Sequence, residues 1–97
     1  MVFSEEMIGQ GKPLVVFFHG SDTFSVKSDQ FLTALYGTGG TKISTYKVEF
    51  NAMTGARIRH SVFLPDTFLL FSGSGVKVQS IVHPTQTELR TLLTTPH

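Results

Sequence analysis

The sequence predicts a single α/β domain spanning residues 1–97, with a central mixed sheet of about four strands flanked by helices. Apolar segments of strand length alternate with segments of helical spacing, in the order α-β-α-β-α-β-β-α. At 97 residues the chain is long enough for one core and too short for two. Its hydrophobic fraction of 40% and charged fraction of 15% exclude a disordered chain.

The N-terminal part predicts a short helix and then a buried strand. Ser4 can cap the helix, and Glu5 and Glu6 suit the positive end of its dipole. Residues 14–18 are all apolar, without the alternation of a half-exposed strand, which indicates a strand covered on both faces. This strand ends in a polar turn before a helix. In an open α/β sheet, ligands and partners bind at such a strand–helix junction.

The middle of the chain predicts a helix, a strand and a second helix. Either Ser21 or Asp22 can cap the first helix. The residues with the spacing of one helical face are Phe24, Ser28, Phe31, Leu32, Leu35 and Tyr36. Glycines at residues 37–40 end this helix, residues 42–50 form the second strand, and Asn51 can cap a helix over residues 52–60.

The C-terminal part predicts a hairpin followed by a helix. Residues 67–71 form a buried strand, residues 72–75 a turn by composition, and residues 76–82 an alternating edge strand. Thr85 and Glu88 match a capping box, and the helix after it has an apolar stripe of leucines. The connections predict parallel strands first and an antiparallel hairpin last.

The composition excludes several classes of function. The net charge of +1 does not provide the strongly basic surface that binding to nucleic acid requires. Without cysteine there is no disulfide, no thiolate catalysis and no cysteine-ligated metal. No signal peptide or membrane span is visible, so we expect a soluble, cytoplasmic or intracellular protein without a cofactor and without contact to a membrane.

Residues 12–93 resemble the thioredoxin family in the order of their elements. Residues 13–18 look like the strand that leads into the family's active-site helix, and residues 64–71 look like its cis-proline loop and the strand after it. The resemblance implies that Pro65 is cis, which would expose the backbone of Leu64 for pairing with an extended peptide. The loop after Pro65 is one residue longer than in the family, and the N-terminal strand is absent or reduced.

The departures from the family bear on function. Residues 22–25 correspond to the Cys-x-x-Cys motif, and Ser21 corresponds to the tryptophan before it. Val16 corresponds to the buried acid of the preceding strand, so Lys47, which matches the family's lysine, lacks that acid as a partner. Thiol–disulfide exchange requires a thiolate, which neither Asp22 nor Ser25 can supply. The resemblance therefore implies a redox-inactive member.

We expect a non-catalytic protein-interaction or structural module that serves as a subunit or adaptor of a larger assembly, such as a virus particle or polymerase complex. Its predicted binding surface consists of Ser21, Asp22, Thr23, Phe24, Ser25, Leu64, Pro65 and Asp66. Phe24 is either an exposed anchor or the first inward-facing residue of the helix. The alternative is a glutathione-transferase-like binder or enzyme, in which Ser25 or Thr23 bonds to the ligand's sulfur. The partner's identity and the oligomeric state do not follow from the sequence.

Other polar clusters favour structural roles. His19 and Asp22 could share the turn, and His83 could approach them from the end of the last strand. Nothing in the sequence supplies a dependable third ligand for a metal, so no metal site is predicted. Ser25 near His19 lacks the orienting acid and oxyanion donors that a nucleophile needs. The basic residues at 57–60 are typical of a solvated helix face.

Overall fold

A mixed sheet of four strands lies at the centre of the computed structural model, which describes residues 4–52 and 54–96. The strands are β1 (Leu14–His19), β2 (Ser44–Glu49), β3 (Thr67–Phe71) and β4 (Lys77–Val82), in the order β2-β1-β3-β4. β1 pairs in parallel with β2 and antiparallel with β3, and β3 pairs antiparallel with β4. The predicted parallel pair and the antiparallel hairpin are both confirmed.

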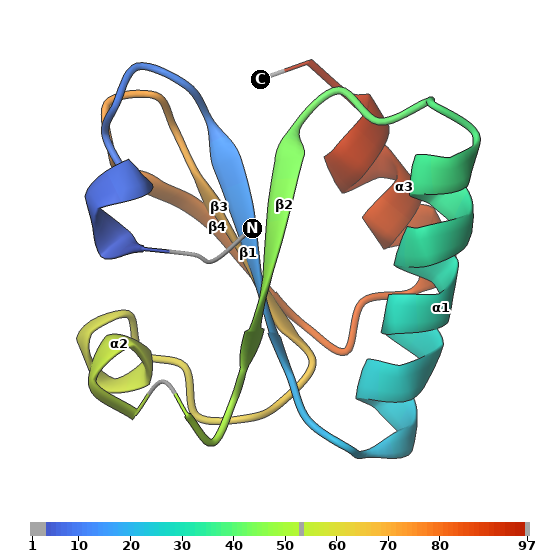
Figure 1. Ribbon diagram of the computed structural model, residues 1–97, viewed down its shortest axis with the longest axis horizontal. Helices are drawn as coiled ribbons and strands as arrows, with labels where there is room; N and C mark the ends of the chain where they lie inside the picture. The colour runs from blue at the N-terminus through green and yellow to red at the C-terminus, as the bar shows by residue number, and fades with distance from the viewer. Residues whose placement is uncertain (1–3, 53, 97) are drawn as a thin grey trace.

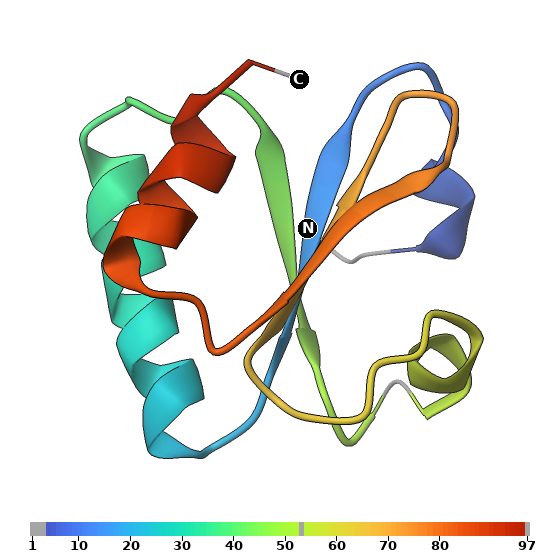
Figure 2. The same ribbon diagram turned by 180° about the vertical axis from the view of Figure 1, so that it is seen from behind.

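Helices cover both faces of this sheet. Helices α1 (Thr23–Gly37) and α3 (Gln86–Thr94) lie on one face, and the 3₁₀ helix η1 (Glu5–Met7) and α2 (Thr54–Arg59) lie on the other (Figures 1 and 2). Both views show the sheet nearly edge-on between these two layers. Within the described ranges, no helix has the length and apolar character needed to cross a membrane.

The alternating side chains of β1 divide the core into two clusters. Val15 and Phe17 point toward α1 and α3, whereas Leu14, Val16 and Phe18 point toward η1 and α2. Successive side chains of a strand point to opposite faces, so an uninterrupted apolar run is the pattern of a strand covered on both sides. All five side chains are buried, which confirms the prediction of a central covered strand.

Local signals in the sequence correctly located several helix ends and the hairpin. The Ser4 hydroxyl accepts from the backbone N–H of Glu6, and Thr85 and Glu88 form the full capping box of α3. The hairpin turn is closed by the N–H of Gly75, which donates to the carbonyl of Ser72 at 3.0 Å. The chain before α2 differs from the prediction, because the helix begins at Thr54 rather than at residue 52, and Met53 lies outside the described residues.

The buried face of α1 is narrower than the spacing predicts. Ser28, Leu32 and Leu35 are buried, but Phe24 and Tyr36 are exposed at the two ends of the helix. Tyr36 reaches the end of the sheet, where its hydroxyl donates to the carbonyl of Ile43 at 2.9 Å. Phe24 lies in the first turn of α1, so spacing along the helix does not by itself bring it over the sheet.

Candidate functional site

The turn from β1 into α1 meets the loop that enters β3 at one end of the sheet, at the bottom of Figure 1. The N–H of Asp66 donates to the carbonyl of Phe18 at 2.8 Å and joins the loop to the end of β1. Gly20 lies between the two segments, since a Cβ placed on it would be 3.0 Å from Oδ1 of Asp22 and 3.2 Å from Cβ of Pro65. The proximity of Pro65 to the turn, which the resemblance implied, is thus present.

Two side chains make the turn rigid. Asp22 is the N-cap of α1, and its Oδ2 accepts from the N–H of Ser25 at 3.0 Å. The Oγ of Ser25 accepts from the N–H of Gly20 at 3.0 Å, and Ser25 is only 1% exposed. Burial acts to raise the pKa of Asp22, but the hydrogen bonds from Ser25 outweigh burial and hold that pKa below its usual range, with a smaller contribution from His83.

Pro65 is trans, so the expectation of a cis bond is wrong. The described residues contain no cis peptide bond. Asp66, in the longer loop after Pro65, adopts a left-handed backbone with φ 61° just before β3. The carbonyl of Leu64 already accepts from the hydroxyl of Thr67 at 2.7 Å, so the structure provides no support for peptide pairing at that carbonyl.

His83 completes the site, and the sequence singled it out only as a distant candidate ligand. Its N–H donates to the carbonyl of Asp66 at 2.9 Å, and its Nδ1 lies 3.2 Å from Oδ2 of that residue. Its ring stacks on Phe24 with centroids 4.2 Å apart. His83 and Asp66 both have positive φ, and such strained residues tend to cluster at functional sites. The one available signal was that His83 follows a strand ending at the same edge as the turn.

Two of the four buried side-chain polar atoms that lack a partner among the described residues lie at this junction. Oδ1 of Asp22 and Oδ1 of Asp66 are both buried, and neither has a hydrogen-bond partner among the described residues. A buried acceptor without a donor is costly, and such atoms are rare in folded proteins. Asp66 also borders a cavity of about 130 Å³ between α1 and α3.

Two exposed apolar side chains belong to the segments that carry these buried polar atoms. Phe24 is 56% exposed and Leu64 is 52% exposed. Phe24 is therefore not an inward-facing core residue, because it is exposed at the start of α1. Thr23 and Ser21 are also exposed, whereas Ser25 and Asp66 are buried beneath the surface.

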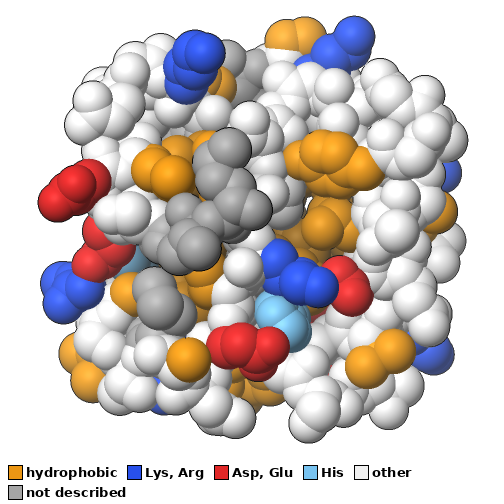
Figure 3. Space-filling model, viewed as in Figure 1, with side chains coloured by type: hydrophobic (Ala, Val, Ile, Leu, Met, Phe, Trp, Pro, Cys, Tyr) orange, Lys and Arg blue, Asp and Glu red, His pale blue; other side chains and the backbone are white. Residues whose placement is uncertain are grey.

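The other candidate clusters have structural contacts. His19 pairs with Glu49 and Lys47 with Asp29, each at 3.2 Å. Figure 3 shows charges of both signs close together over the lower part of β2. Across residues 4–52 and 54–96, no group of three His, Cys, Asp or Glu side chains is placed to hold a metal ion.

The basic cluster of α2 holds η1 in place. The guanidinium of Arg59 donates to Glu5, and Nε2 of His60 lies 3.0 Å from Oε1 of Glu5. The hydrogen bond from Arg59 is the main reason that the pKa of Glu5 is lowered. The guanidinium of Arg57 lies 3.9 Å from the ring centroid of Phe50. All three basic residues of this cluster therefore have acidic or aromatic partners within the same chain, since Arg59 and His60 contact Glu5 and Arg57 lies over Phe50.

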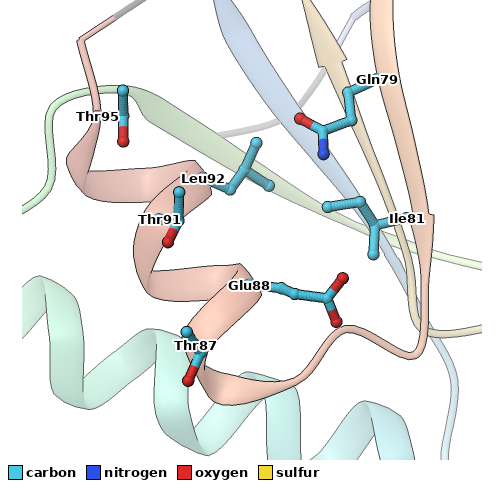
Figure 4. A pocket seen from close by; sticks show the side chains of 7 residues that line it. All are labelled: Gln79, Ile81, Thr87, Glu88, Thr91, Leu92 and Thr95. Carbon is cyan, nitrogen blue, oxygen red and sulfur yellow. The ribbon is translucent and has the colours of Figure 1, made fainter.

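A separate groove of about 250 Å³ lies between β4 and α3 (Figure 4). Its floor is formed by Ile81 and Leu92, and threonine side chains line the helix side. Glu88, the one charged residue that lines it, already bonds to the N–H of Thr85 in the capping box. The groove therefore contains no acid–base or nucleophilic pair.

Comparison with known proteins identifies the fold. No protein-family model and no curated protein sequence matches this chain. The crystal structure of Trxlp from Edwardsiella tarda EIB202 is similar over 97% of both chains, with a TM-score of 0.81 and 19% identity. The solution structure of oxidised thioredoxin from Plasmodium falciparum matches 91% of this chain and 84% of its own, with a TM-score of 0.74 and 19% identity.

A third structure, oxidised thioredoxin O2 from Arabidopsis thaliana, covers 91% of this chain and 77% of its own, with a TM-score of 0.71 and 20% identity. These likenesses agree with the observed strand order and with the helices on both faces of the sheet. At the junction after β1, this chain has Asp22 and Ser25 at the positions that the resemblance aligns with Cys-x-x-Cys, and it has no cysteine elsewhere. The chain has a thioredoxin-like fold without the thiols of thioredoxin chemistry.

Proposed function

We propose that the protein is a non-catalytic interaction or structural module, and that it acts as a subunit or adaptor of a larger assembly. It contacts its partner through the exposed members of a docking edge, defined as Ser21, Asp22, Thr23, Phe24, Ser25, Leu64, Pro65 and Asp66, in which Ser25 and Asp66 lie beneath the surface. With no cysteine in the chain, thiol–disulfide exchange has no nucleophile. What the junction offers a partner is its shape, its apolar side chains and its acceptor oxygens.

The exposed ring of Phe24 is the observation that carries this proposal. Phe24 is 56% exposed, yet its ring is stacked on that of His83 with centroids 4.2 Å apart. The cap of Asp22 on Ser25 also fixes the backbone on which Phe24 lies. An aromatic side chain that is ordered before binding provides a large contact area at a low entropic cost, as interface anchors do.

Leu64 extends the same surface from the loop before β3. It is exposed, while its carbonyl is held by Thr67 and its neighbour Pro65 packs on Gly20. The docking edge therefore combines two exposed apolar side chains with a backbone that hydrogen bonds hold in place. A preorganised apolar surface of this kind suits a protein partner, because little order has to be gained on binding.

A quantitative pull-down with two matched variants tests the docking edge. We expect Phe24→Ser to lose the partner that the wild-type chain retains. Ile58→Ser removes an equally apolar side chain from α2, where Ile58 is 66% exposed, and it should retain that partner. Equal retention by both variants, or equal loss, contradicts the proposal.

A titration with reduced glutathione, followed by amide shifts, distinguishes the proposed interaction module from the alternative, a glutathione binder. Saturable shifts at Thr23 and Ser25 would favour that role. We expect none, because Ser25 is buried and its hydroxyl oxygen already accepts from Gly20.

A further inference from the structure

The strand β4 lies at one edge of the sheet, because the strands are arranged in the order β2-β1-β3-β4. It pairs with β3 on one side, and in Figure 2 it runs in front of the other strands. An edge strand presents N–H and C=O groups that lack a strand partner, and a further strand can add to them. The open side of β4 is therefore a surface on which the sheet can be extended.

The backbone groups of Ser80 and Val82 point to this open side. At the end of the β3–β4 ladder, the N–H of His83 donates to the carbonyl of Asp66 at 2.9 Å. In an antiparallel pair, positions that bond to the neighbouring strand alternate with positions that do not, so Val82 and Ser80 direct their N–H and C=O groups away from β3. Outside the β3–β4 ladder, neither residue has a hydrogen bond in the described part of the chain. Their donors and acceptors are available to a second strand.

The side chains of residues 78–82 lack the features that prevent edge-to-edge pairing. They are Val, Gln, Ser, Ile and Val, without a charge or a proline, and the two valines are 60% and 44% exposed. Lys77 and an irregular register mark the start of this segment and confine pairing to the residues after it. The opposite edge, β2, carries Lys47 and Glu49. Of the two edges, β4 is therefore the one suited to pairing.

A groove of about 250 Å³ separates β4 from α3, so the helix leaves room beside the strand (Figure 4). Ile81 and Leu92 form its floor. Glu88 is the one charged residue that lines it, and its Oε1 accepts from the N–H of Thr85 at 2.9 Å. A strand added beside β4 would extend the apolar floor of the groove with its own side chains.

We propose that β4 pairs antiparallel with β4 of a second copy of this chain, about a two-fold axis at Ile81. This register sets Ser80 of each copy opposite Val82 of the other, so that outward-pointing N–H and C=O groups bond in pairs. The two Ile81 side chains face each other at the axis, on the side of α3. A second copy fits because the paired segment carries no charge and therefore does not repel itself. The inference goes beyond the proposed function and does not rest on it.

The contact is short, so the dimer should form as the concentration rises. A standard interface involves about 20–30 residues on each side, many more than one edge strand supplies. Each docking edge adjoins the end of β4 through the contact of His83 with Asp66. Antiparallel pairing therefore places the two docking edges toward opposite ends of the joined strands, and two sites in one particle raise avidity for a repeated partner.

Sedimentation equilibrium of the full chain, from micromolar to millimolar concentration, measures this dimer. We expect the wild-type chain to approach twice its monomer mass as its concentration rises. Ser80→Pro removes the N–H that donates across the pair, and an edge strand tolerates proline where that N–H faces solvent. Because the change deletes a hydrogen bond on each side of the axis, it should weaken the dimer about tenfold or more. Ser80→Ala keeps the N–H and is the matched control, which should dimerise as the wild type does.

The absence of cysteine from the chain allows a test of the register. Ser80→Cys and Val82→Cys are prepared as separate variants, and disulfide-linked dimers are followed by non-reducing electrophoresis during mild oxidation. Residues opposite one another in a bonded antiparallel pair have Cα atoms about 5.5 Å apart, within the range of a disulfide, whereas diagonal positions are about 7–8 Å apart. An equimolar mixture should therefore form linked dimers about fivefold or more faster than either variant alone.

The inference is overturned by a wild-type chain that stays monomeric at millimolar concentration, by a Ser80→Pro dimer as tight as that of the wild type, or by a mixture of cysteine variants that links no faster than either alone. Faster linkage by Ser44→Cys, on the opposite edge, than by the mixture would assign the pairing to β2 and overturn it as well. Circular dichroism shows whether Ser80→Pro is folded. If it is not, the cysteine variants decide the inference, because neither removes a backbone donor.

Discussion

Replacing Asp22 with alanine removes the N-cap of α1 at the centre of the docking edge. The lost contact is the 3.0 Å hydrogen bond from the N–H of Ser25 to Oδ2 of Asp22. Loss of an N-cap costs about 1 kcal/mol and at most about 2 kcal/mol. For a domain of this size, 1 kcal/mol lowers the Tm by about 4–8 °C. We therefore expect a folded but measurably less stable variant.

Urea unfolding followed by far-ultraviolet circular dichroism measures this loss. Asp22→Asn keeps an acceptor for the cap and loses only the charge beside the helix N-terminus, which contributes about 0.3–1 kcal/mol. At neutral pH we expect the free energy of unfolding to be highest for the wild type, lower for Asp22→Asn and lowest for Asp22→Ala. Because the pKa of Asp22 is lowered in the folded state, the contribution of its charge is present above the ordinary value of 3.8 and is lost as the pH falls through the folded pKa.

Thr85→Ala is the control, because Thr85 is the N-cap of α3 and forms a capping box there. It should destabilise the chain by an amount similar to that of Asp22→Ala. If Thr85→Ala loses stability and Asp22→Ala does not, the cap of Asp22 does not stabilise α1, and the account of a rigid turn beneath Phe24 is refuted.

Two further predictions concern contacts that hold the rest of the fold. The hydrogen bond from Arg59 lowers the pKa of Glu5, so this ion pair should stabilise the chain above pH 4.5 and cease to do so as the pH falls through the folded pKa. Urea unfolding of Glu5→Gln against pH should show a difference from wild type of under about 1 kcal/mol that vanishes in acid. A Cβ on Gly73 would lie 2.9 Å from the backbone of Gly11, so Gly73→Ala should cost about 1–3 kcal/mol. Gly37→Ala, which meets no atom within 4 Å and lies in the last turn of α1, serves as its control and should raise the Tm, because alanine in a compatible conformation stabilises by about 0.4–1 kcal/mol.

Much of the fold follows from local patterns in the sequence. The apolar run at residues 67–71 predicts β3 with the bounds that the structure shows, and the run before His19 predicts β1 to within one residue. Thr85 and Glu88 predict the start of α3 through a capping box that forms as expected. These signals work because each depends on residues a few positions apart, whose local conformation their own side chains constrain.

The geometry of the candidate site follows less directly from the sequence. Helical spacing placed Phe24 with the buried face of α1, but the first turn of the helix extends past the cover of the sheet. Resemblance to the thioredoxin family implies a cis bond at Pro65, whereas the bond is trans and the next residue, Asp66, has a positive φ. The sequence indicates no role for His83 beyond that of a distant metal ligand, because 17 residues separate it from Asp66 along the chain.

The sequence by itself determined which chemistry is absent and which elements form. A chain without cysteine has no thiolate, and alternating apolar and helical segments specify an α/β domain. Only the tertiary structure decided that Asp66 and His83 meet beside Phe24, and that Oδ1 of Asp66 is buried without a partner among the described residues. The physical reason is that these contacts depend on sheet register. The pairing of β3 with β1 and β4 brings the ends of distant strands together, and no local pattern encodes that meeting.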